Sequence, residues 1–186
     1  MEQSLYNSGV HTGAGRIVLN ADSDQAIDGD GTGVFENLEL NKPSSGNVEV
    51  ILKSNTTIEG ALIFSGASAG YKKFNIGANN LHLGPDATVA GAGENRFIFT
   101  NGEVGNRSVT KDYTSASSSF TFPVGAPSPN HGDARYTPAT IGFSSDPVTY
   151  GSITVVPVGM EHPTVSVSGQ SLTYYWRVKA EDSEGL

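Results

Sequence analysis

Apolar and polar residues alternate in short stretches that recur through the first hundred residues of the chain. Four of these stretches, "NLEL", "ALIF", "NLHL" and "RFIF", carry two large apolar side chains at positions two apart. The apolar pairs are Leu38 and Leu40, Leu62 and Phe64, Leu81 and Leu83, and Phe97 and Phe99. Because successive side chains of a strand point to opposite faces, each pair lies on one face of its strand. The pattern therefore predicts short strands that bury one face.

The intervals between these stretches indicate a coiled β architecture. Leu62 follows Leu38 after 24 residues, and the next two stretches follow after a further 19 and 16 residues. Further strand candidates lie between them, at residues 48–52, 57–58, 74–76 and 88–89. Loose repeats of about 20 residues with several short strands are typical of a solenoid, whose stacked coils bury a face that one coil leaves exposed. We expect residues 1–105 to form a short right-handed parallel β-solenoid; a β-sandwich with long loops is the alternative.

The pattern changes after Gly102. Longer alternating runs follow, separated by loops that contain proline and glycine, and this arrangement is typical of antiparallel sandwich sheets. The expected strands are residues 120–122, 136–143, 152–158 and 172–179. We therefore expect residues 106–186 to form an antiparallel β-sandwich-like unit, and the predicted fold class of the whole chain is all-β.

Composition supports an all-β chain and excludes two classes of partner. The 186 residues are 37% hydrophobic and only 16% charged, and they include 23 glycines, 9 prolines and no cysteine. The net charge of −8 repels phosphate backbones, so nucleic acid is not an expected partner. No apolar run approaches the roughly 20 residues that span a bilayer, so we expect no direct insertion into a membrane.

Several short motifs occur in an order that resembles a known class of module. They are "SGVHTGAGRIVLNADSDQAIDGDGTGVFENLELN", "RFIFTNG", "FTFPVG", "RYTPATIGF" and "YYWRV". Together, over about residues 8–179, they resemble repetitive modules of large secreted surface proteins of Bacteroidetes-type bacteria. In those modules a β-solenoid ends in a Thr-Asn-Gly turn and leads into a small β-sandwich with a tryptophan strand. Such proteins are typically exported by the type IX secretion route.

The resemblance implies an extracellular or cell-surface location and a non-catalytic structural or adhesive role, as a stalk, spacer or adhesin segment. The implied partners are cell-surface or extracellular matrix components, including polysaccharide, and no catalytic residues carry over. Two other functions remain open. The chain could be a carbohydrate-binding module of a secreted polysaccharide-processing protein, or, less in keeping with its residues, a polysaccharide lyase or hydrolase.

An acidic stretch holds the candidate metal ligands. The residues from Asp28 to Glu39 fit the spacing of an EF-hand calcium loop, but both flanks are predicted strands rather than helices. In a strand, Glu39 points away from the face that carries Leu38 and Leu40 and cannot close such a loop. The remaining calcium candidates are Asp22, Asp24, Asp28 and Asp30. One loop could gather these four carboxylates around a hard cation such as calcium. The pattern favours the other interpretation, a solvated acidic turn. No other cofactor is expected.

Candidate sugar contacts and catalytic groups are few. Exposed aromatic rings can stack on sugar rings, and the candidates are Tyr71, Tyr113 and Tyr175. A lyase or hydrolase would combine carboxylates with lysine or arginine on an outer sheet. The exposed candidates for that role are Lys72, Lys73, Glu94 and Arg96. We interpret these charges as groups that keep the sheet soluble, and we predict that the chain is not an enzyme.

Two apparent catalytic signals are interpreted as structural. "GASAG" at residues 66–70 matches the nucleophile elbow of hydrolases, but it lies between two predicted strands, so Ser68 is expected in a turn. The four histidines, His11, His82, His131 and His162, lack metal-ligand spacing. His82 alternates with two leucines, so we expect it to face outward from its strand.

Overall fold

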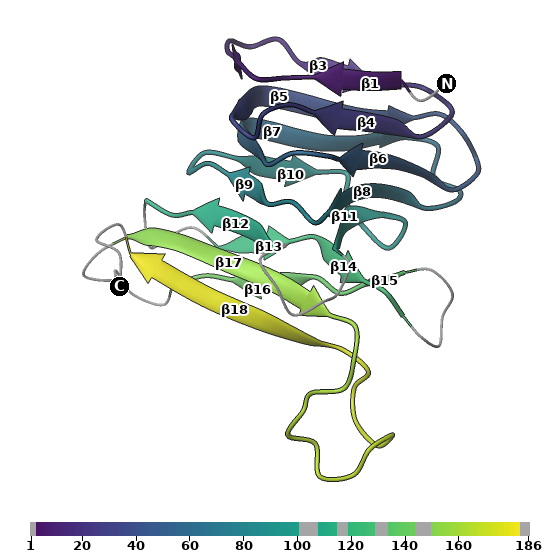
Figure 1. Ribbon diagram of the computed structural model, residues 1–186, viewed down its shortest axis with the longest axis vertical. Helices are drawn as coiled ribbons and strands as arrows, with labels where there is room; N and C mark the ends of the chain where they lie inside the picture. The colour runs from purple at the N-terminus through teal and green to yellow at the C-terminus, as the bar shows by residue number, and fades with distance from the viewer. Residues whose placement is uncertain (1–2, 101–107, 115–118, 129–133, 144–149, 183–186) are drawn as a thin grey trace.

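The computed structural model describes residues 3–100, 108–114, 119–128, 134–143 and 150–182. All regular structure in this part of the chain is β, and it contains no helix that could cross a membrane. Figure 1 shows the strands stacked in flat coils, from β1 at one end to β18 at the other.

Two large sheets, which we call sheet A and sheet B, form the two faces of the stack. Sheet A contains β1 (Gln3–Tyr6), β4 (Gln25–Asp28), β6 (Val48–Leu52), β8 (Lys72–Gly77), β11 (Arg96–Thr100), β14 (Val124–Ala126) and β15 (Arg135–Tyr136). Sheet B contains β2 (Val10–His11), β3 (Ile17–Leu19), β5 (Gly33–Lys42), β7 (Thr56–Gly66), β9 (Leu81–Leu83), β10 (Thr88–Ala90), β12 (Val109–Asp112), β17 (Gly151–Val158) and β18 (Tyr175–Asp182). A two-stranded sheet pairs β13 (Phe120–Phe122) with β16 (Ala139–Ile141).

Successive coils pair in parallel, so that each coil contributes strands to both sheets. In sheet A, Val50 lies opposite Phe74 in the next coil, and Phe74 lies opposite Ile98 in the coil after that. These neighbours are 24 residues apart in the sequence. About five coils follow this arrangement, and antiparallel strands come after them. The predicted all-β fold class, a parallel solenoid followed by antiparallel strands, is confirmed.

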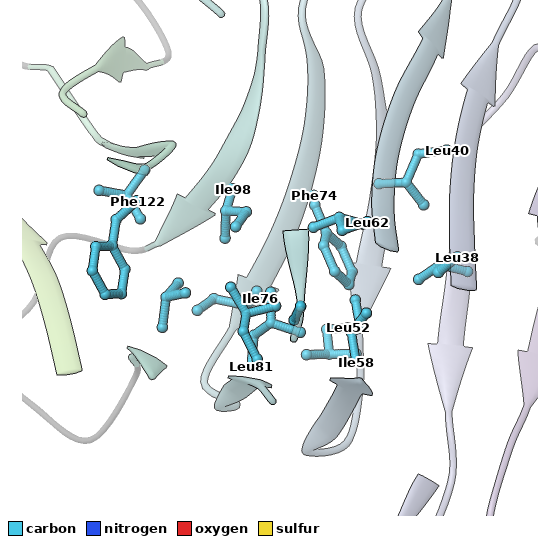
Figure 2. Close-up of a cluster of buried hydrophobic side chains, with 14 of the residues drawn as sticks. Leu38, Leu40, Leu52, Ile58, Leu62, Phe74, Ile76, Leu81, Ile98 and Phe122 are labelled. Carbon is cyan, nitrogen blue, oxygen red and sulfur yellow. The ribbon is translucent and has the colours of Figure 1, made fainter. Parts of the chain in front are cut away.

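Inward-facing side chains stack into columns between the two sheets. One column of sheet A consists of Val50, Phe74, Ile98 and Val124, and one column of sheet B consists of Ile17, Leu38, Leu62 and Val89. Figure 2 shows leucine, isoleucine and phenylalanine side chains of successive coils meeting in this core. Each such side chain contributes about 1.5–3 kcal/mol when it is fully buried. The parallel register thus converts a repeat in the sequence into one continuous core.

Two of the four alternating stretches do not stack as their sequence intervals suggest. Leu62 continues the column of the first stretch, but Leu81 lies opposite Thr56, and Phe97 belongs to sheet A. The cause is the length of β7, which runs over eleven residues and contains a bulge at Gly60. β9 continues the first half of β7, and β10 continues the second half. The structural repeat is therefore close to 24 residues, longer than the predicted one.

The inward face of β11 also differs from the prediction. Ile98 points into the main core, whereas Phe97 and Phe99 lie in a second, smaller cluster. That cluster lies on the outer face of sheet A, where Tyr71 and Tyr136 pack against it. Alternation correctly identified the two residues that share a face of β11. It could not show which face meets the main core, because both faces of this strand are buried.

Asparagine side chains connect the turn of one coil to the turn of the next. Asn47 Oδ1 accepts a hydrogen bond from the backbone N–H of Tyr71 at 2.8 Å. Asn55 Oδ1 accepts the N–H of Asn80 at 2.9 Å, and Asn80 Oδ1 accepts that of Ser108 at 3.2 Å. Each bond joins the side chain of one turn to the backbone N–H of the next turn, so that this N–H keeps a hydrogen-bond partner in the folded chain. These bonds therefore help to hold successive coils in register.

Three lysines are almost fully buried, and each donates hydrogen bonds to several oxygens. Lys42 Nζ donates to two backbone carbonyl oxygens of the preceding turn and to Gln25 Oε1. Lys72 and Lys111 each donate to three backbone carbonyl oxygens. Burial lowers the pKa of all three ammonium groups, that of Lys42 to about 8. These side chains thus tie together the carbonyl oxygens of neighbouring turns.

Parallel pairing continues beyond residue 105 and then gives way to antiparallel pairing. β12 pairs in parallel with β9, and β14 pairs in parallel with β11. The later strands β15, β17 and β18 pair antiparallel and extend the two large sheets. The strand predicted at 136–143 is divided into β15 and β16 around Pro138, which has no N–H to donate. The last strand begins at Tyr175, three residues later than predicted.

Leu62→Ala should lower the free energy of unfolding by about 2–5 kcal/mol, because it leaves a cavity in a fully buried column. Leu172→Ala is the matched control, because Leu172 is 64% exposed, and it should change stability by less than about 0.5 kcal/mol. Urea denaturation followed by circular dichroism measures both changes. Equal losses in the two variants would contradict the columnar core.

Lys42 should make stability depend on pH. Because burial lowers its pKa from 10.5 to about 8, the unfolded chain binds more protons than the folded chain between these pH values. The stability that this group contributes is therefore present above pH 10.5 and is lost as the pH falls through about 8. In Lys42→Met the contribution of this group is lost, so the free energy of unfolding should rise less with pH over this range than in the wild type. Denaturation of both proteins across that range tests it, and parallel pH profiles would contradict it.

Candidate functional site

A groove of about 650 Å³ crosses the outer face of sheet B near the C-terminal end of the stack. It spans β9, β12, β17 and β18, which lie side by side in the sheet (Figure 1). Its lining consists mainly of polar side chains: Asn80, His82, Ser108, Thr110, Ser152, Thr154, Val156, Arg177, Val178, Lys179 and Glu181. We call this surface the sheet B groove.

Strand register arranges the polar side chains of the groove in rows. Thr110 of β12 lies opposite His82 of β9 and Thr154 of β17. Thr154 in turn lies opposite Lys179 of β18, which completes a row across four strands. The next residue of β17, Val155, points into the main core and is fully buried. Because side chains alternate along a strand, core packing on one face determines the position of the polar row on the other.

Hydrogen bonds join neighbouring side chains of the groove. The hydroxyl groups of Thr110 and Thr154 lie 2.8 Å apart, within hydrogen-bonding distance. The hydroxyl of Ser108 donates to Asn80 Oδ1 at 3.0 Å. These contacts restrict the side chains before a ligand arrives, and side chains ordered in advance reduce the entropy lost on binding. The floor of the groove is thus a prearranged set of neutral hydrogen-bonding groups.

Charged groups of both signs lie along the sides of the groove. On the β9 side, His82 Nε2 lies 2.9 Å from Asp112 Oδ2. On the β18 side, Lys179 pairs with Glu181, and Arg177 adds a second cation. A neutral floor between mixed charges suits a polar ligand that offers both donors and acceptors, such as one rich in hydroxyl groups.

The three candidate sugar-stacking tyrosines occupy different environments. Tyr113 was expected to be exposed, and this expectation is wrong: it is 3% exposed, and burial raises its pKa to about 12. Its ring packs edge-to-face on Phe143 at 5.1 Å as part of the main core. Tyr175 is half-buried and packs on the ring of His162. Tyr71 is also half-buried and lines a pocket together with Tyr136, whereas Tyr113 borders two other pockets with little of its surface exposed.

The four candidate calcium ligands are divided into two pairs. Asp22 and Asp24 precede β4, whereas Asp28 and Asp30 lie at its other end. A strand of this length spans ~13 Å, far more than the roughly 2.4 Å that separates calcium from each of its ligands. Among the residues that the structure describes, no three acidic or histidine side chains gather into a metal site. One loop does not collect all four carboxylates.

Asp24, Asp30 and Glu39 each have a local structural partner. Asp24 Oδ1 accepts the backbone N–H of Glu49 in the next coil at 2.8 Å. Asp30 accepts hydrogen bonds from the hydroxyl and the N–H of Thr32, and these bonds lower its pKa. Glu39 points outward from β5, as predicted, and pairs with Arg16 at 2.9 Å. The acidic stretch therefore forms turns and an outer-face ion pair, with no EF-hand geometry.

The four charged candidates for a catalytic site do not form an exposed group. Lys72 and Lys73 were expected to be exposed, and both are buried. Lys72 bonds to turn carbonyls, and Lys73 Nζ pairs with Glu49 Oε1 at 2.7 Å. Arg96 donates to the backbone carbonyl at the end of β7 at 2.6 Å, and Glu94 is exposed. Three of the four groups thus have structural partners of their own.

The structural interpretation of Ser68 and of His82 is confirmed. Ser68 lies in the turn between β7 and β8, and His82 faces outward from β9 while its leucine neighbours are buried. His162 contacts Tyr175, and His11 is half-buried in β2. His131 lies outside the described residues.

The groove residues were not identified from the sequence, although part of the signal is there. Ser152 and Thr154 alternate with buried Ile153 and Val155, so a polar outer face of β17 was predictable. What could not be predicted is that this face continues onto β9, some 70 residues earlier in the chain.

Comparison with protein families, curated proteins and solved structures finds no match for this chain. The geometry of the site therefore has to carry any functional proposal.

Calcium should leave the thermal stability of the protein unchanged, because the four aspartates do not share a cation site. We expect the Tm with millimolar calcium chloride and with excess chelator to agree within about 1 °C. Differential scanning calorimetry measures this difference. A rise of several degrees that disappears in Asp24→Asn or Asp30→Asn would instead show that one of the pairs binds calcium.

Proposed function

We propose that this chain is a non-catalytic structural or adhesive module of a secreted cell-surface protein, with the sheet B groove as its adhesive surface. The observation that carries the proposal is the row of side chains from His82 to Lys179, which places polar groups from four strands on one prearranged surface. A site built on strands holds its side chains more accurately than a site built on loops.

The solenoid suits the structural part of this role. Its coils are joined by backbone ladders in two sheets, by asparagine side chains at the turns and by columns of buried apolar side chains. None of these interactions requires a disulfide bond or a bound metal. A module of this kind keeps its surface in a constant shape outside the cell, where the motifs quoted above imply that it works.

The chemistry of the groove favours binding over bond cleavage. A nucleophilic hydroxyl needs a base within hydrogen-bonding distance, whereas the central hydroxyl groups of Thr110 and Thr154 bond to each other. Hydroxyl groups with cations and carboxylates beside them match the donors and acceptors of extracellular polysaccharides and of polar protein surfaces. We therefore expect the partner to be a cell-surface or matrix component.

The test is retention of the protein on immobilised glycans and extracellular matrix proteins, measured by surface plasmon resonance. Replacing both cations of β18, as Arg177→Ala with Lys179→Ala, should weaken binding to the retained partner by about tenfold. Loss of charge at the rim of a site should also make the remaining binding less sensitive to salt.

Arg16→Ala is the matched control, because Arg16 is exposed outside the sheet B groove. It should bind like the wild type, and circular dichroism should show that all three proteins are folded. Failure of the wild type to bind any of these surfaces would contradict the adhesive role. Equal binding by the double variant would show that the groove is not the contact surface.

A further inference from the structure

A second pocket lies on the outer face of sheet A, remote in the fold from the sheet B groove. Its volume is about 300 Å³, and it is lined by Tyr71, Glu94, Asn95, Ala134, Arg135 and Tyr136. These residues come from the turn before β8, the turn before β11 and the region of β15. Segments far apart in the sequence meet here because the coils stack, so this pocket exists only in the folded stack.

The aromatic part of the pocket is anchored on a buried ring. Tyr71 contacts Phe97 edge-to-face with 6.3 Å between ring centroids, and Tyr136 contacts the same ring at 5.7 Å. Phe97 has room because Gly125 lies beneath its ring, where a Cβ atom would come within 2.5 Å of it. Both tyrosines are half-buried and line the pocket, so part of each ring is fixed and part is available to a ligand.

The polar part of the pocket supplies hydrogen-bonding groups of three kinds. The Glu94 carboxylate accepts hydrogen bonds, the Asn95 amide both accepts and donates, and the Arg135 guanidinium donates. Arg135 is held in place, since its Nη1 donates to Thr173 Oγ1 at 2.9 Å and its guanidinium stacks over the ring of Tyr174. A side chain fixed before binding loses little entropy when the ligand arrives.

We propose that this tyrosine pocket binds a single neutral pyranose ring. A pyranose presents an apolar face of C–H groups, which packs on an aromatic ring, and a rim of hydroxyl groups that both donate and accept. The pocket combines two aromatic side chains with an acceptor, an amide and a donor in a space suited to a small ligand. This activity is separate from adhesion by the sheet B groove, because it uses another sheet and other residues.

The charges favour a neutral sugar over an acidic one. Glu94 would repel the carboxylate of a uronic acid, and the net charge of −8 adds to that repulsion. Arg135 already has two partners on the 173–174 segment, which leaves it less free to neutralise an anion. A free sugar and the terminal residue of a neutral polysaccharide offer the same ring, and probes of different length distinguish these two sources.

The experiment is a titration followed by ligand-observed and protein-observed NMR. The probes are the methyl glycosides of glucose, mannose and galactose, a linear trisaccharide of whichever binds, and galacturonic acid. We expect at least one neutral glycoside to bind, the trisaccharide to bind within about threefold of it if the pocket holds one ring, and galacturonic acid to bind at least about fivefold more weakly. Stronger binding of galacturonic acid would overturn the proposal.

Matched variants locate the site. Tyr71→Ala and Tyr136→Ala should weaken binding at least about tenfold, whereas Tyr71→Phe, which keeps the ring, should stay within about threefold of the wild type. Tyr175→Ala removes a half-buried tyrosine outside the pocket and should have no effect.

Glu94→Gln tests the same site without touching the aromatic cluster, because Glu94 is exposed. It should weaken binding of the neutral glycoside and reduce the discrimination against galacturonic acid. If the wild type binds no neutral glycoside, or if binding survives in all of the pocket variants, the tyrosine pocket is not a sugar site. Loss of sugar binding only in the Arg177 and Lys179 double variant would show that the sugar binds in the sheet B groove instead.

Discussion

Parallel hydrogen bonding between coils about 24 residues apart is the constraint on which the rest of this structure depends. Once Val50, Phe74 and Ile98 lie opposite one another, the neighbouring positions of β6, β8 and β11 are also aligned, up to a register shift after Phe99. One coil alone cannot bury its apolar face, because it has no second layer above or below it. The core, the turns and both outer faces therefore form together, as consequences of a single register.

Polar side chains support this register by connecting the turns of successive coils. Turn residues do not continue the strand ladders, so their backbone N–H and C=O groups need other hydrogen-bond partners. Asparagines at the turns accept the N–H groups of the next coil, and buried lysines donate to carbonyl oxygens. Lys42 shows the cost of this solution, since burial lowers its pKa to about 8. An apolar residue at this position would remove the ammonium donor from two backbone carbonyl oxygens and from Gln25 Oε1.

The two proposed binding surfaces lie on the outer faces of different sheets and differ in the side chains that form them. In sheet B, antiparallel β17 and β18 continue the sheet beyond the solenoid, and their outward residues add to those of β9 and β12 to form a polar groove. In sheet A, Phe97 and Phe99 form a small buried cluster on the outer face, and Tyr71 and Tyr136, which pack against it, remain partly exposed. The first surface is polar and extended, and the second is aromatic and small. Both are rigid because the strands beneath them are held by the same core.

The sequence by itself determined the all-β class, the solenoid and the residues that share a face within each strand, because alternation is a local property of the backbone. Only the tertiary structure decided which strands became neighbours and which rings stayed exposed. Tyr113 enters the core, while Tyr136, which carries no distinctive pattern, lines a pocket with Tyr71. The physical reason is that exposure depends on what packs over a side chain. That depends on coil length and bulges such as the one at Gly60, which alternation does not encode.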